Sequence, residues 1–426
     1  MGKLKTFIEE IKSSEFFKNV FILSSGTALA QLIPVMIAPI LSRIYSPEEF
    51  GRLALYLAII QILGSLSTGR YELAILLPKE EKRGVQLTLI SIFFTVVVSF
   101  ISLIVVLVYN TELAVLLGDP KLDVWLYLVP VSVLMVGVFN ALNYYNTRVK
   151  KFKNIARANI YKSSGGGVVQ LVLGGLKLTS GGLILGQTLS HFFGNIRLSK
   201  TLLENKKTIL DSKIPELKDL AKRYIDFPKF SMWGIFLNSL SANVINMFVS
   251  RVFSLSTVGF YSLAYRYLGL PSTLVGNAFS QVYMVEASES RRKKGNAKEE
   301  FLGVLKKLSV VSLLFLIIGV FFVEEVFVIV FGEEWRFSGK YARILIPLFA
   351  IRLVVTALSV TFSVFEKQRE SLIWNIILVA ASIFAMIISY LCNMEMTLFL
   401  YLYSGTLSVF YLVLLYRAYK ISKGTN

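Results

Sequence analysis

Long apolar stretches separated by short polar segments run along the chain from Phe21 to Tyr416. Twelve of these stretches reach about 20 residues, the length that a helix needs to cross a hydrocarbon layer about 30 Å thick. We therefore predict an all-α integral membrane protein with twelve transmembrane helices. The predicted spans are Phe21–Leu41, Gly51–Leu77, Gln86–Val108, Trp125–Asn146, Ala156–Leu176, Leu178–Leu198, Ser231–Phe253, Val258–Val282, Leu302–Val323, Ala342–Phe365, Ser371–Cys392 and Thr397–Tyr416.

A charged gap at 201–228 divides the predicted spans into two sets of six. We predict a six-helix lobe at 1–198, a linker at 199–228 and a second six-helix lobe at 229–426. An even number of spans per lobe makes both lobes start on the same side, which gives a parallel repeat about a pseudo-two-fold axis. Transporters with such repeats bind their substrate between the two halves.

Sequence identities at one fixed offset support the repeat. Adding 208 to the numbers of 42–46 and of Gly51 places Ser-Arg-Ile-Tyr-Ser on Ser-Arg-Val-Phe-Ser and Gly51 on Gly259. We expect Arg43 and Arg251 to lie at equivalent outer helix ends, where they bind headgroups or C-terminal carbonyls.

The basic residues are distributed very unevenly between alternate loops. With the N-terminus inside, and with basic residues near the end of a span counted with the adjoining loop, 33 of the 45 Lys and Arg fall on the inner side, 8 on the outer side and four deeper within spans. The positive-inside rule then places both termini in the cytoplasm. The net charge of +18 is thereby explained by topology and by anionic membrane lipids as partners, and it is no sign of nucleic-acid binding.

The linker also carries regularly placed apolar residues. Two interpretations stay open, an amphipathic helix on the inner membrane surface and a solvated tether between the lobes. The residues are Leu202, Leu203, Ile209, Leu210, Ile214, Leu217 and Leu220.

Common catalytic and cofactor motifs are missing from the sequence. It has no Gly-x4-Gly-Lys-Ser/Thr phosphate loop, so it predicts no nucleotide site. His191 is the only histidine and its span offers no carboxylate or thiol, so we expect a hydrogen-bonded interior group there and no metal site. Cys392 is the single cysteine, which excludes an internal disulfide. We predict no cofactor and no catalytic residues.

Charges inside the predicted spans are the clearest candidates for function. Arg352, Arg266, Arg70 and Lys162 lie within spans, where a charge costs at least about 2.5–3.5 kcal/mol. They either line a water-filled cavity or make structural pairs, and Lys162 and Arg70 could also extend to the inner surface. The excess of cations favours an anionic passenger such as a phosphate, which the planar guanidinium suits.

Glu72 is the one acidic residue well inside a span, and we assign it to ion coupling. Residues at i and i+2 do not face each other on a helix, so we expect Arg70 and Glu72 to have separate partners. Amides and tyrosines nearby suit sugar hydroxyls, although the same groups also join helices. We assign substrate binding to Asn143, Tyr144, Asn243 and Asn246 beside the four cations.

The segments 25–51 and 69–75 resemble the first part of bacterial polysaccharide flippases. These belong to the multidrug/oligosaccharidyl-lipid/polysaccharide exporter superfamily, and the nearest type is the O-antigen flippase. The resemblance implies two six-helix bundles around a cationic cavity, in the cytoplasmic (inner) membrane of a bacterium. It implies that an oligosaccharide on undecaprenyl pyrophosphate is turned from the inner to the outer leaflet by alternating access. It further implies H+ or Na+ as coupling ion, and a polysaccharide polymerase and a chain-length regulator as candidate partners.

Two alternatives remain. One is a multidrug antiporter of the same superfamily, which would change drug tolerance. The other is an integral-membrane polysaccharide polymerase or ligase, a class typically marked by a long outer loop, whereas the outer loops predicted here are shorter than the linker. We therefore expect a transporter and not an enzyme.

Overall fold

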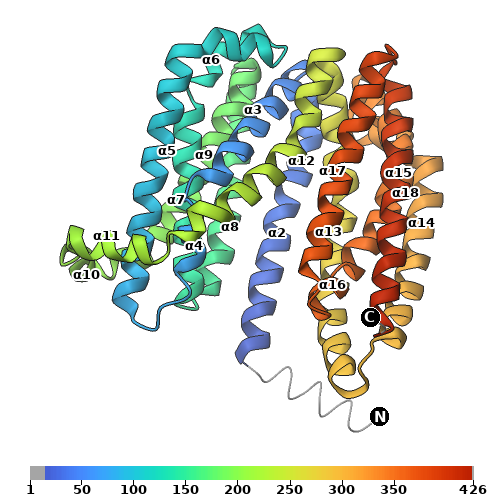
Figure 1. Cartoon of the computed structure of the whole chain (residues 1–426). Helices are drawn as coiled ribbons and strands as arrows, with labels where there is room; N and C mark the ends of the chain where they lie inside the picture. Colours follow the sequence, from blue (N-terminus) through green and yellow to red (C-terminus); the bar gives the residue numbers. More distant parts are fainter. Residues whose placement is uncertain (1–14, 425–426) are drawn as a thin grey trace. The chain divides into compact units, whose positions relative to one another are not determined.

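The computed structural model describes residues 15–424, and side chains from Ser25 onward. All regular structure in this range is helical (Figure 1). The principal helices are α2 (Glu15–Ile44), α3 (Pro47–Leu66), α4 (Tyr71–Ala74), α5 (Glu81–Leu116), α6 (Asp123–Leu126), α7 (Val129–Arg148), α8 (Phe152–Gly175), α9 (Thr179–Leu203), α10 (Lys206–Leu210), α11 (Ile214–Arg223), α12 (Met232–Val252), α13 (Leu255–Lys294), α14 (Lys298–Phe331), α15 (Arg336–Leu358), α16 (Thr361–Val364), α17 (Gln368–Leu391) and α18 (Met396–Ser422). Single turns η1 (Pro120–Leu122), η2 (Phe227–Ser231) and η3 (Glu333–Trp335) complete the list.

Eight candidate membrane spans in the described range are long and apolar enough to cross a membrane. The pair Pro120–Leu126 and Val129–Arg148, bent by 52°, would make a ninth. The other three predicted spans coincide with α8, α9 and α13, which do not reach the same apolarity. An all-helical, multi-pass membrane protein is confirmed, whereas the number twelve stays a prediction.

The helices form two compact units. The first contains the chain up to Tyr45 and from Arg52 to Met247, and the second contains Ser46–Gly51 and the chain from Phe248 onward. Each unit has its own core, and each is described separately. The predicted lobes at 1–198 and 229–426 and their superposition by a two-fold axis stay predictions.

The helices of the first unit approach closely because small residues lie at the points where the helices cross. A Cβ on Gly166 of α8 would lie 3.1 Å from the Gly186 carbonyl oxygen of α9, and one on Gly186 would lie 2.9 Å from the Gly166 carbonyl oxygen. Tyr56, Ser132 and Thr188 then link α3, α7 and α9 through hydroxyl hydrogen bonds of 2.8–3.0 Å. Such polar links stabilise helix contacts in an apolar medium, where neighbouring lipid offers no partner.

The linker helices pack onto this first unit. Ile209 and Leu217 contact a core cluster that contains Leu220, while Leu210 and Ile214 are about four-fifths exposed. Glu216 of α11 pairs with Lys82 of α5 at 2.8 Å, so α11 lies across the start of α5 (Figure 1). The apolar face predicted in the linker is therefore partly used for packing within the unit.

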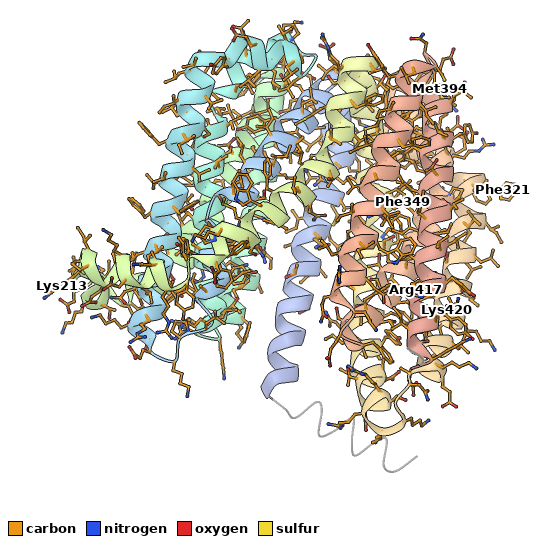
Figure 2. All side chains as sticks on the ribbon, viewed as in Figure 1. Lys213, Phe321, Phe349, Met394, Arg417 and Lys420 are labelled. Atoms are coloured by element: carbon orange, nitrogen blue, oxygen red, sulfur yellow. The ribbon has the colours of Figure 1, made fainter. Side chains whose placement is uncertain are left out.

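The second unit is built around α13, α14, α15 and α18. Figure 2 shows Phe349 of α15 among these helices and Phe321 of α14 projecting away from them. The exposed fractions are 0% for Phe349 and 73% for Phe321. Exposed apolar side chains along α14 are expected on a surface that faces lipid, because hydrocarbon does not oppose their exposure.

The two glycines related by the 208-residue offset meet in the second unit. A Cβ on Gly51 would lie 2.0 Å from the Leu255 carbonyl oxygen, and a Cβ on Gly259 would lie 1.9 Å from the Pro47 carbonyl oxygen. The offset relates Pro47 to Leu255 as it relates Gly51 to Gly259, so the contact is reciprocal. A local two-fold relation between these segments would produce this reciprocity.

The arginines of the matched motif lie at helix ends, as the sequence predicts, whereas their placement on the outer side of the membrane stays a prediction. Arg43 and Arg251 are in the last turns of α2 and α12. Arg43 Nη1 donates to the Pro39 carbonyl oxygen at 2.7 Å, which confirms the expected contact with a C-terminal carbonyl.

Candidate functional site

Arg70 and Glu72 lie at a break between α3 and α4 in the first unit. Gly69 and Arg70 both have left-handed backbone conformations, with φ of 58° and 62°. This break turns the side chain of Arg70 toward Glu72, and Nη1 lies 3.1 Å from Oε1. Glu72 is buried, and Thr68 donates a second hydrogen bond to its carboxylate. The Nε of Arg70 is buried and has no partner among the described residues.

The expectation of separate partners for Arg70 and Glu72 was wrong. It assumed one continuous helix through 51–77, in which i and i+2 point apart. The helix ends at Leu66 and a new turn begins at Tyr71, so the i, i+2 rule does not apply there.

Lys162 of α8 lies inside the first unit and does not extend to an acidic partner. Its Nζ is 4.8 Å from the ring centroid of Phe139. His191 of α9 meets the same ring edge-on at 5.7 Å, and its Nδ1 is 3.3 Å from the hydroxyl of Ser190. His191 is thus the hydrogen-bonded interior group that the sequence predicts. Lys162 makes no ion pair with any residue in the described range.

Arg352 of α15 lies among aromatic rings in the second unit. Its Nη1 donates to the Tyr265 hydroxyl at 2.8 Å, and its guanidinium carbon is 5.0 Å from the Phe349 ring centroid. The rings of Tyr265 and Tyr411 lie at 5.6 and 5.9 Å. Cation–π contacts stabilise the guanidinium without neutralising it. No carboxylate of residues 25–424 pairs with Arg352, so its positive charge remains available to an anion.

Arg266 of α13 is exposed, and it makes no hydrogen bond or ion pair with the described residues. It lies eleven residues into α13, about 17 Å from the start of that helix at a rise of 1.5 Å per residue. Water or a bound anion would have to stabilise the charge of Arg266 if this side chain lies within the membrane.

The amides assigned to substrate binding have incompletely satisfied side chains. The Oδ1 atoms of Asn143 and Asn246 are buried and lack hydrogen-bond partners within the described part of the chain. Asn243 is more fully bonded, to the Ser239 carbonyl oxygen at 2.9 Å and to Gln61 Oε1 at 3.4 Å. Tyr144 packs at the edge of an apolar cluster. Buried polar atoms without partners are unusual and mark positions where a ligand or water fits.

The structure thus groups Arg70 with Glu72 and Lys162 with His191, and it places Arg352 in an aromatic surround. A further cluster was missed. Six basic residues near the α7–α8 turn and the end of α9 form an open pocket. The sequence contained its signal as a run of lysines at 150–153, but the run was interpreted only as topology.

Comparisons with known proteins identify the family and the fold of the chain. Residues 40–339 match the family described as polysaccharide biosynthesis protein. The chain is 23% identical over 311 residues to the succinoglycan biosynthesis transport protein ExoT of Rhizobium meliloti, and 26% identical over 168 residues to the teichuronic acid biosynthesis protein TuaB of Bacillus subtilis. These alignments cover 70% and 37% of this chain, and 59% and 35% of the lengths of those relatives.

Solved structures share the fold at low sequence identity. An inward-facing multidrug resistance MATE family transporter of the MOP superfamily superposes with a TM-score of 0.71 and 15% identity, covering 92% of this chain and 93% of that one. The lipid II flippase MurJ in an inward closed conformation gives 0.68 and 14%, covering 94% and 90%. With the family match extending over 300 residues, the chain belongs to the polysaccharide biosynthesis protein family and has the fold of the MOP superfamily.

Proposed function

We propose that this protein turns undecaprenyl-pyrophosphate-linked oligosaccharides from the inner to the outer leaflet of a bacterial cytoplasmic membrane. Both termini are assigned to the cytoplasm by the distribution of basic residues. Family membership supports a polysaccharide precursor as substrate, and the similarity to MOP superfamily structures supports a transporter and not an enzyme. The coupling ion, H+ or Na+, and the pathway proteins that act before and after transport belong to the same proposal.

The observation that carries the proposal is positive charge that the protein itself does not neutralise. Glu72 is engaged by Arg70, while Arg352, Arg266 and Lys162 have no acidic partner in the described range. Placing such charges in an apolar layer is costly unless water or an anion accompanies them. A pyrophosphate would supply the negative charge that these cations lack. One guanidinium group can donate two parallel hydrogen bonds to two oxygens of a phosphate. Asn143, Tyr144, Asn243 and Asn246 would then bind the sugars.

Ion coupling would act through Glu72. Binding of H+ or Na+ at its carboxylate would weaken the 3.1 Å contact and release Arg70 for the substrate phosphate. Departure of the ion would restore the pair and displace the phosphate. Glu72→Gln should therefore leave substrate binding intact and remove the dependence of transport on the ion gradient.

The test is a flipping assay in proteoliposomes that contain a fluorescent undecaprenyl-pyrophosphate oligosaccharide, with a membrane-impermeant quencher outside. Arg352→Ala should slow flipping about 100-fold or more, because it would remove the two charge-assisted hydrogen bonds proposed between Arg352 and the pyrophosphate, at about 1.5–3 kcal/mol each. Arg352→Lys should recover only part of the rate, since an ammonium lacks the paired geometry. Arg266→Ala should slow flipping as well.

Arg343→Ala is the matched control. Arg343 lies on the same helix, is exposed, and is 3.7 Å from Glu324. Equal protein abundance and melting temperature for all variants exclude a folding defect. Normal flipping by Arg352→Ala and Arg266→Ala together would disprove the assignment. Drug efflux by the wild type without lipid flipping would identify the antiporter alternative instead.

A further inference from the structure

An open pocket lies in the first unit where α7 ends, α8 begins and α9 ends. Its volume is about 430 Å³, within the range of about 300–1,000 Å³ that small-molecule sites occupy. Six basic residues line it, whereas Glu204 is its one acidic residue. The basic residues are Lys150, Lys151, Lys153, Arg157, Arg197 and Lys200.

Most of this charge has no acidic partner among residues 25–424. Lys151 is the one basic residue of the pocket in an ion pair with a described residue, with its Nζ 2.5 Å from Glu204. The Nε of Arg197 is buried without a hydrogen-bond partner in the same range. Five like charges around one hollow repel one another, so an anion in the hollow would lower the free energy of the folded protein.

The start of α8 adds to the positive electrostatic potential of the pocket. The residue at its N-cap, Lys151, has no capping hydrogen bond, and its first turn contains no acidic residue. The backbone N–H groups of a helix start carry partial positive charge and suit phosphate oxygens. Lys150 reverses the chain just before it in a left-handed conformation, with φ of 56°.

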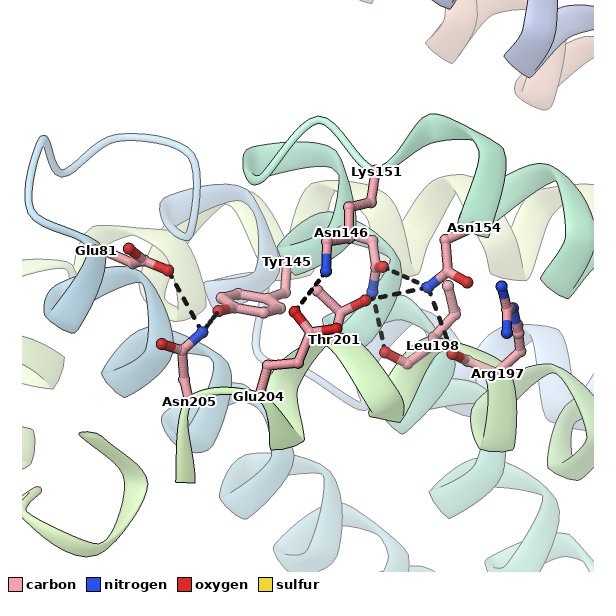
Figure 3. A network of polar contacts seen from close by, with 10 residues as sticks. All are labelled: Glu81, Tyr145, Asn146, Lys151, Asn154, Arg197, Leu198, Thr201, Glu204 and Asn205. Atoms are coloured by element: carbon pink, nitrogen blue, oxygen red, sulfur yellow. Dashed lines mark hydrogen bonds and ion pairs between the residues drawn. The ribbon is translucent and has the colours of Figure 1, made fainter. Parts of the chain in front are cut away.

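Hydrogen bonds between residues that line the pocket and their neighbours join the three helices (Figure 3). Asn146 is fully buried and donates to the carbonyl oxygens of Leu142 and Leu198 at 2.8 and 3.2 Å. Asn154 donates to Asn146 Oδ1 at 2.8 Å and to Thr201 Oγ1 at 3.1 Å. Because α7, α8 and α9 are joined in this way, the helix ends that carry the cations are held together before a ligand arrives, which reduces the entropy lost on binding.

The geometry points to a binding site for the phosphate groups of a lipid at the inner membrane surface. The pocket lies at helix ends on the side that the basic residues assign to the cytoplasm, at the level of lipid headgroups. Basic pockets between transmembrane helices on that side bind phosphorylated headgroups in other membrane proteins. Both an anionic phospholipid and the pyrophosphate of the proposed substrate have the required chemistry.

The second of these ligands rests on the proposed function. A pyrophosphate held in the pocket would wait beside α8, whose Lys162 lies only five residues, about 7.5 Å along the helix, beyond Arg157. The pocket would then raise the local concentration of substrate before transport begins.

The test uses the full chain in phosphatidylcholine nanodiscs with three probes. These are undecaprenyl pyrophosphate in the bilayer, phosphatidylglycerol in the bilayer, and inorganic pyrophosphate in the buffer. The variant K153Q/R157Q/K200Q removes three unpaired cations of the pocket. The control R292Q/K306Q/K307Q removes equal charge from exposed positions in the second unit. The shift in melting temperature with probe concentration gives the apparent affinity.

At about five-fold per basic residue, the pocket variant should bind a lipid probe about 100-fold more weakly than the wild type, and the control should bind normally. A loss for undecaprenyl pyrophosphate identifies substrate docking, and a loss for phosphatidylglycerol alone identifies a structural lipid. Equal binding of both lipids by variant and control, or an effect on inorganic pyrophosphate alone, would overturn the proposal.

Transport measurements separate this inference from the proposed function. The pocket variant should require more substrate for half-maximal flipping and keep its maximal rate, whereas Arg352→Ala should lower the maximal rate. If the protein binds lipid in the pocket but flips no lipid, the proposed binding site is supported and the proposed flippase function is wrong.

Discussion

Arg52 and Asp119 form a buried ion pair in the first unit, and its loss should be among the costliest single changes in the protein. The Nε of Arg52 lies 2.6 Å from Oδ2 of Asp119, and Nη2 lies 3.2 Å from Oδ1. The two side chains are 7% and 5% exposed. Arg52 also donates to the Ser180 hydroxyl at 3.1 Å, so the pair joins the starts of α3 and α9 to the turn after α5.

Removing one residue of the pair leaves the charge of the other residue buried and unpaired. We expect Arg52→Met and Asp119→Leu each to lower the free energy of unfolding by about 3–5 kcal/mol. Asp119→Leu should cost about 1 kcal/mol more, because its carboxylate also caps the following turn at the backbone N–H of Lys121. The double variant R52M/D119L removes both charges and should be more stable than either single variant.

The assay is thermal unfolding of the purified protein in nanodiscs, followed by tryptophan fluorescence. Lys293→Met is the control, because Lys293 pairs with Glu289 at 2.5 Å on an exposed surface and such pairs contribute at most about 1 kcal/mol. The expected order is wild type and control above the double variant, with both single variants lowest. A folded Arg52→Met protein with the melting temperature of the wild type would refute this reasoning, as would a double variant less stable than both singles.

Three further predictions concern backbone contact, pH and topology. Gly51→Ala should lower the melting temperature, because its Cβ would lie 2.0 Å from the Leu255 carbonyl oxygen and overpacking costs about 1–3 kcal/mol; Gly303→Ala, with no atom nearby, should be neutral or stabilising. Hydrogen bonds from a lysine and a glutamine of α5 lower the pKa of Glu216 below 4.5. A lowered pKa stabilises the folded contact above pH 4.5 and the effect is lost as pH falls, so the protection factors for hydrogen exchange in 214–223, corrected for the intrinsic rate at each pH, should fall in acid, and Glu216→Gln should abolish that dependence. Ser212→Cys in a cysteine-free background should resist impermeant thiol reagents in intact cells, and rapid labelling there would contradict cytoplasmic placement of the linker.

Apolar periodicity was sufficient to predict the helical membrane fold, because a bilayer leaves few alternatives to a continuous helix. The spans predicted at α8, α9 and α13 are helices in the structure, but these helices are less apolar than the other spans, because polar and small residues in them serve contacts inside the units. Gly166 and Gly186, for example, lower the apolarity of their helices and at the same time permit the close α8–α9 crossing. Hydropathy shows the lowered apolarity but contains no information on the helix crossing.

For the charged residues, the sequence could identify unusual positions but could not always identify their partners. Depth along a predicted span identified Arg352 and Lys162 as unusual, and the structure leaves both without an acidic partner in the described range. The partner of Arg70 was predicted wrongly because two left-handed residues replace the helix there. A Gly-Arg pair within an apolar run indicates a break only weakly, since many glycines occur inside membrane helices.

Partners distant in sequence could not be predicted at all, and they determine where the positive charge is usable. Arg52 and Arg197 are both arginines near helix ends, yet Arg52 is neutralised by Asp119 while Arg197 has a buried Nε without a partner. One carboxylate, placed by a turn 67 residues away, makes the first a structural residue. Arg197, Lys153 and Arg157 make no ion pair with a described residue, although Glu204 lines the same pocket, and this is why we propose an anion from outside the protein as its ligand. The packing of the helices therefore decides which of these arginines has an acidic partner, and neither sequence position nor depth along a span contains that information.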